Sequence, residues 1–127
     1  MSESAIRFID PPVSNDRIIA YEIDGHFTAD DMRAFMERLE ELTAQGKKAL
    51  LYQDIENYDG VDIAAVRVKL KNMGALWKGT EKIAVIGDAR WLEVYINVVD
   101  SITPQQMKHF STAEKDAAWA WLVEGGE

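Results

Sequence analysis

The sequence contains no cysteine, which excludes disulfide bonds, thiolate metal sites and cysteine nucleophiles together. Histidine is also scarce: His26 and His109 are too few, and too far apart in the chain, to suggest a zinc site. Neither has a nucleophile motif beside it, and the chain has no G-x-S-x-G sequence and no glycine-rich phosphate loop. We therefore expect no metal, no cofactor and no catalytic residue.

Positive charge is in short supply. Lys and Arg number 14 against 22 Asp and Glu, which gives a formal net charge of -8. Most of the surface of such a protein repels a phosphate backbone or an anionic lipid surface. Nucleic acid is therefore not an expected partner.

Long apolar runs are absent as well. None approaches the roughly 20 residues that a membrane-spanning helix needs. The first residues, Met1–Ser4, carry no basic segment and are followed by no apolar one, so a secretory signal is not indicated. We expect a cytoplasmic protein without a membrane span.

What the chain does contain is the composition of an ordinary globular protein, with 47% hydrophobic and 28% charged residues. Its 127 residues suit one hydrophobic core, and they show no linker, repeat or low-complexity segment. We expect a single domain over residues 1–127.

Five segments have the patterning of β-strands. The apolar run at 49–52 is typical of a central strand buried on both faces, whereas 17–24 alternates between two faces. Gly25 is expected to close that second strand, and the first two strands are expected to form a hairpin. The predicted strands cover residues 6–9, 17–24, 49–52, 82–86 and 106–110.

Four further segments predict helices, near residues 28–46, 63–78, 89–99 and 111–122. Thr28 is suited to cap the first helix, and Ser111 with Glu114 forms a capping box before the last. The order of the elements predicts an α/β fold with about five strands in a mostly parallel, mixed sheet and four helices. Right-handed crossovers should join the parallel neighbours.

Four motifs resemble those of the SpoIIAA-like family. They are Asp24–Asp31, Tyr58–Gly60, Lys82–Trp91 and Ala118–Leu122, and they occur in the family's order. The resemblance runs from about Arg17 to Leu122. It implies the fold of STAS domains, found in anti-anti-sigma factors, with a kinship to the lipid-binding CRAL-TRIO (SEC14) fold.

The resemblance also implies a place where STAS switches are phosphorylated, on a Ser that begins the second helix after the third strand. The matching segment here, Asp54–Asp62, contains neither Ser nor Thr. The phosphorylation switch is therefore not expected in this protein.

The predicted third helix is apolar nearly all the way round, although a helix with one face in water normally shows a polar stripe. Its surplus apolar face could meet another subunit, a hydrophobic ligand or the last helix. The residues concerned are Trp91, Leu92, Tyr95, Ile96 and Val99.

Acidic residues gather at the predicted ends of the third and fourth strands, where ligands of open α/β sheets tend to bind. They could serve a hard cation or acid-base chemistry, or they could be caps, turn residues and solvated charges. The residues are Asp54, Glu56, Asp59, Asp62 and Asp88.

Three functions follow from these patterns. The first is a non-catalytic interaction module that forms a homodimer or binds a protein partner through the third helix and a turn at Tyr58, Asp59 and Gly60. The second is a binder of a small hydrophobic or lipid-like molecule, with Met32, Met36, Met73 and Trp77 as candidate lining. The third is an enzyme that uses the region of Asp54 and Asp88.

Overall fold

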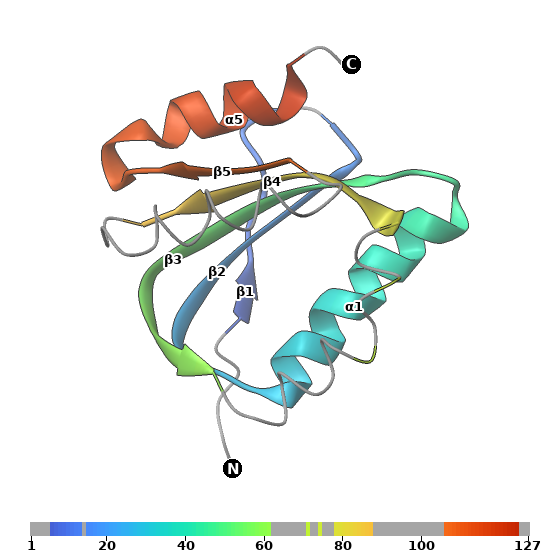
Figure 1. The fold of residues 1–127 in the computed structure, drawn as a ribbon, viewed down its shortest axis with the longest axis horizontal. Coiled ribbons are helices and arrows are strands. Elements are labelled where there is room, and N and C mark those ends of the chain that lie inside the picture. Colours follow the sequence, from blue (N-terminus) through green and yellow to red (C-terminus); the bar gives the residue numbers. More distant parts are fainter. Residues whose placement is uncertain are drawn as a thin grey trace.

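The computed structural model describes residues 6–13, 15–61, 71, 74, 78–87 and 106–124, and for 26, 57–61 and 106 it describes the backbone alone. Five strands form one sheet in the order β1-β2-β3-β4-β5 (Figure 1). Strand β1 pairs antiparallel with β2, and the other three pairings are parallel. The strands are β1 (Ile6–Phe8), β2 (Ile18–Phe27), β3 (Ala49–Val61), β4 (Thr80–Ile86) and β5 (Gln106–Phe110).

The mixed five-stranded sheet and its N-terminal hairpin are thus confirmed. The described residues contain two complete α-helices, α1 (Ala29–Ala44) and α5 (Lys115–Val123). A 3-10 turn, η1 (Thr112–Glu114), directly precedes α5. The other two predicted helices lie largely outside the described residues. Of the second, the structure describes Lys71, Gly74 and Lys78, and it describes the adjoining Gly79, all with helical backbone.

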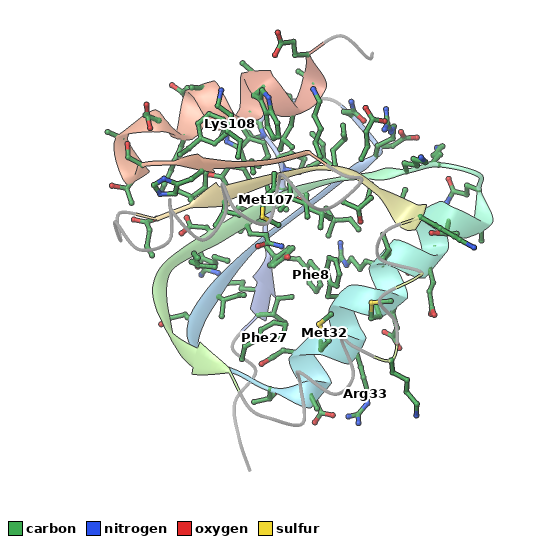
Figure 2. The ribbon with its side chains drawn as sticks, viewed as in Figure 1. Phe8, Phe27, Met32, Arg33, Met107 and Lys108 are labelled. Carbon is green, nitrogen blue, oxygen red and sulfur yellow. The ribbon has the colours of Figure 1, made fainter. Side chains whose placement is uncertain are left out.

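The two helices lie on opposite faces of the sheet, each over its own hydrophobic cluster (Figure 1). Side chains alternate between the faces because successive residues of a strand point to opposite sides. Figure 2 shows this on β5, where Met107 lies on the α1 side and Lys108 on the α5 side. Both faces of the sheet are therefore covered, as a parallel sheet requires.

Helix α1 forms because its buried residues recur at three- and four-residue steps and its first turn is capped. The Thr28 hydroxyl accepts a hydrogen bond from the Asp31 amide (3.2 Å), and the Asp31 carboxylate accepts one from the Thr28 amide (2.8 Å). Met32 therefore points toward the sheet, whereas Arg33 points away from it (Figure 2). The buried residues are Asp31, Met32, Phe35, Met36, Leu39 and Leu42.

Helix α5 begins after the predicted capping box, which is confirmed: the Ser111 amide donates to the Glu114 carboxylate at 2.8 Å. Trp119 of this helix stacks face to face on Tyr52 of β3, with ring centroids 3.7 Å apart. Both aromatic residues are buried. This stacked pair anchors the middle of α5 on the centre of the sheet.

Two predictions about strand length were wrong. Strand β2 continues past Gly25 to Phe27, and β3 continues past Tyr52 to Val61, so Tyr58–Gly60 lies in a strand rather than in a turn. Gly, Asn and Asp usually mark loops. Here the two strands pair with each other along this whole stretch, and the ladder outweighs the local preference of those residues.

Candidate functional site

The segment Ile55–Val61, here called the β3 extension, is the part of β3 that runs beyond the last residue paired with β4. Strand β4 ends opposite Asp54, at Ile86, while β2 stays paired with β3 as far as Val61. Figure 1 shows the carboxyl ends of β2 and β3 curving together away from those of β4 and β5. The predicted site residues Tyr58, Asp59 and Gly60 all lie in this extension.

Two register shifts interrupt the pairing of the β3 extension with β2. At the first, Ile23 of β2 faces both Ile55 and Glu56 of β3. At the second, Asp59 is the extra residue, next to Gly25, whose φ of 99° belongs to the left-handed region that glycine tolerates. Bulges of this kind bend a strand and are common beside functional sites.

A small charged cluster, Asp54, Glu56 and Lys115, lies where the extension begins. The ammonium of Lys115, the first residue of α5, is 2.8 Å from Glu56 Oε2 and 3.5 Å from Asp54 Oδ2. Asp54 Oδ1 also accepts a hydrogen bond from the Glu56 amide at 3.1 Å. The cluster therefore joins β3 to the start of α5.

Burial and hydrogen bonding shift the pKa values of this cluster and of the neighbouring Tyr52. Burial raises the pKa of Asp54 above its usual range, and the neighbouring carboxyl of Glu56 adds to the rise. The hydrogen bond to Glu56 raises the pKa of Lys115 to about 12. Burial likewise raises the pKa of Tyr52, two residues before Asp54, to about 12.

Of the predicted acidic group, the structure brings Asp54 and Glu56 together. Asp59 is described by its backbone alone, and Asp62 and Asp88 lie outside the described residues. Within the described part of the chain, no three His, Cys, Asp or Glu side chains are placed to hold a metal ion. The described cluster is therefore an ion-pair network between two elements of the fold.

Sequence reasoning missed Lys115 and Lys82. The first turn of the last helix follows the end of β5, so it lies at the edge of the sheet where β3 carries its carboxylates. That topology was the signal for pairing Lys115 with Asp54. No such signal marks Lys82, a lysine within an apolar strand whose ammonium donates to the main-chain carbonyls of Trp121 (2.8 Å) and Glu124 (3.0 Å).

The remaining predicted site residues divide in two. Met32 and Met36 are buried in the cluster between α1 and the sheet, where they pack with core residues. The others, Met73, Trp77, Trp91, Leu92, Tyr95, Ile96 and Val99, lie outside the described residues. Their proposed roles, as lining of a hydrophobic site or as an interaction surface, stay predictions.

No helix of the described residues combines the length and the apolar character that crossing a membrane requires.

The architecture defined above is a mixed-sheet α/β domain with a helix on each face. A family model described as SpoIIAA-like matches residues 18–123, and the chain belongs to the SpoIIAA-like family. No curated protein matches the chain.

The solved structures that are similar to this chain include the following two. One is an uncharacterised protein of the DUF3478 family with a SpoIIAA-like fold from Shewanella loihica PV-4, at 26% identity and a TM-score of 0.77. The alignment covers 97% of this chain and 99% of that one. The other is the anti-sigma factor antagonist SpoIIAA in its unphosphorylated form, at 12% identity and a TM-score of 0.56, covering 89% and 94% of the two chains. This second likeness concerns the fold alone.

Proposed function

We propose that the protein is a non-catalytic interaction module that associates with a second copy of itself, through a surface that includes the β3 extension. The observation that carries the proposal is the pairing of β3. Beyond Asp54 it has β2 on one side, and no described strand on the side where β4 has ended. An open strand edge presents amide and carbonyl groups that another extended segment can pair with.

The helix predicted at 89–99 supplies the apolar part of the proposed surface, through Trp91, Leu92, Tyr95, Ile96 and Val99. It directly follows β4 in the sequence, and β4 is the neighbour of β3 in the sheet. Backbone pairing at the extension and apolar burial at this helix would complement each other, since apolar burial drives most association.

Two further points support a binding role rather than catalysis. The carboxylates described at the site, Asp54 and Glu56, are engaged with Lys115 instead of being presented beside a nucleophile. The anti-sigma factor antagonist whose fold this chain shares is, by its name, a protein that acts on another protein. The segment Asp54–Asp62 has no Ser or Thr, so we infer that Ser or Thr phosphorylation there does not control binding. We place this module in the cytoplasm.

Sedimentation velocity over a range of concentrations tests the proposal. Tyr58→Glu and Ile96→Glu each put a charge on the proposed surface, and two copies then bring like charges together. We expect each to weaken the dimer by at least roughly tenfold in Kd, a difference of about 1.4 kcal/mol. Gln45→Glu, at the exposed end of α1, introduces the same charge elsewhere and should leave the dimer unchanged.

Far-UV circular dichroism and thermal unfolding of each variant confirm that it has folded. A dimer that resists both Tyr58→Glu and Ile96→Glu would place the contact on another surface. A hydrophobic molecule that co-purifies with a monomer would instead favour the small-molecule binder.

A further inference from the structure

Asp54 lies at the point where β3 leaves its regular register with β2. The residue pairs change from Glu22–Asp54 to Asp24–Asn57, so β3 carries one extra residue there. A bulge disrupts the ladder around its extra residue. The Asp54 carboxylate accepts a hydrogen bond from the Glu56 amide inside this bulge, at 3.1 Å. Asp54 therefore holds the backbone conformation from which the β3 extension starts.

The other oxygen of the same carboxyl group, Asp54 Oδ2, contacts α5 through Lys115. Lys115 reaches Asp54 and Glu56 from the first turn of that helix. The stack of Trp119 on Tyr52 fixes the helix over the sheet. The position of the Lys115 ammonium thus depends on how α5 packs on the sheet. The conformation of the bulge depends in turn on the two carboxylates that pair with this ammonium.

We propose that the Asp54–Glu56–Lys115 cluster is a regulatory joint. Through it, the position of α5 on the sheet controls the conformation of the β3 extension. This inference rests on the proposed function, because it assigns a control to the same surface. Coupling of this kind is reciprocal, so an extended segment that binds the β3 extension also changes the position of α5 on the sheet.

The joint also responds to protons. Burial and the Glu56 carboxyl raise the pKa of Asp54, so acidification neutralises Asp54 before an ordinary surface aspartate. The neutral carboxyl costs less to bury, so its protonation favours the packed form of the joint. On β2, Glu22 is the register partner of Asp54 and forms an ion pair with Arg7 of β1. On β3, Tyr52 precedes Asp54 by two residues, and Asp116 of α5 is among the groups that raise the pKa of Tyr52.

Hydrogen exchange followed by mass spectrometry tests the joint without any partner. Lys115→Met keeps the side chain's length and removes its charge. We expect exchange to become roughly tenfold faster in peptides that cover the β3 extension, since hydrogen bonds to charged groups are among the stronger ones. Exchange at Leu50–Tyr52, near the start of the same strand, where β3 is paired on both sides, should not change. Lys108→Met, an exposed lysine on the α5 side of β5, is the matched control and should change neither region.

Faster exchange confined to η1 and the first turn of α5, with the extension unchanged, would overturn the joint. Lys115 would then stabilise only the start of α5. If Lys115→Met unfolds the whole domain, wild type and Asp54→Asn are compared as the pH is lowered. We expect acidification to slow exchange at the extension of the wild type, relative to the intrinsic rates of the amides, and to slow it less in Asp54→Asn. Equal responses would also overturn the joint. These exchange measurements need no dimer, so they can be made even if the protein does not self-associate. A failure of the joint is therefore distinguishable from a failure of the proposed function.

Discussion

The ammonium of Lys82 on β4 donates hydrogen bonds to the main-chain carbonyls of Trp121 (2.8 Å) and Glu124 (3.0 Å), at the far end of α5 from Lys115. It also lies 5.1 Å from the centre of the Trp121 ring. A buried lysine is usually unfavourable. Here the carbonyls that end a helix carry the partial negative charge that a cation prefers.

Lys82→Met should therefore lower the free energy of unfolding by about 1–3 kcal/mol, because it leaves helix-end carbonyls without a charged donor. Urea denaturation measures the change. Lys108→Met, which removes an exposed lysine from the neighbouring strand, should alter stability by less than about 0.5 kcal/mol. Equal effects of the two substitutions would mean that the contacts of Lys82 with α5 do not stabilise the fold.

Asp54→Asn should raise the melting temperature at neutral pH. The pKa of Asp54 is raised in the folded protein, so the folded state binds a proton there more tightly than the unfolded state does. The stabilising contribution of the protonated group is complete below its unfolded pKa of 3.8, and it is lost as the pH rises through the higher folded value. At pH 7 the charged carboxylate thus costs stability.

Asparagine removes that charge and keeps an oxygen that can accept from the Glu56 amide. Thermal unfolding from pH 3 to pH 7 checks this linkage. We expect the advantage of Asp54→Asn over the wild type to shrink as the pH falls toward the unfolded pKa. An advantage of the wild type at pH 7 that disappears in acid would show that Lys115 more than offsets the burial of Asp54.

Gly79 packs closely against α1. A methyl group added there would lie 3.1 Å from Thr43 Oγ1 and 3.3 Å from Leu39 Cδ1, and Leu39 is buried. We expect Gly79→Ala to destabilise the protein by about 1 kcal/mol, since an overpacked core forces its neighbours to shift.

Gly74 provides the matched control. It too has helical backbone, but a methyl group added there meets nothing within 4 Å. Gly74→Ala should stabilise the protein by about 0.5–1 kcal/mol, because alanine favours helix and restricts the unfolded chain. Chemical denaturation of both variants measures the opposite signs, and a shared sign would contradict the packing of Gly79 against α1.

Trp119→Ala should cost about 3–5 kcal/mol, the range for removing a large buried aromatic side chain. It removes both the area that Trp119 buries and its stack on Tyr52. Ala120→Ser, at the next and exposed position of α5, is the control and should be nearly neutral. Loss of the near-UV circular dichroism signal with an unchanged far-UV signal would locate the effect in aromatic packing. A small loss in the free energy of unfolding would contradict the anchoring role of the stack.

Much of the fold was predictable because it rests on local patterns. The apolar spacing of Met32, Phe35 and Leu39 specifies helix α1, and Thr28 and Ser111 mark helix starts with side chains that cap amides. The continuous apolar run at 49–52 likewise indicates the centre of a parallel sheet.

The candidate site was harder to predict because it depends on pairing between distant segments. Gly25 and Gly60 are poor strand residues on their own, and both lie in strands because β2 and β3 pair along their whole extension. The position of Lys115 beside Asp54 depends on the packing of α5 over β3, which no local pattern in either segment encodes.

The most direct test of the proposed function is the solution mass of the wild-type protein by light scattering, with native mass spectrometry on the same preparation. We expect a dimer with no bound small molecule, and the dimer should be lost in Ile96→Glu. A monomer that carries an apolar molecule would contradict the interaction module and support a hydrophobic-ligand binder instead.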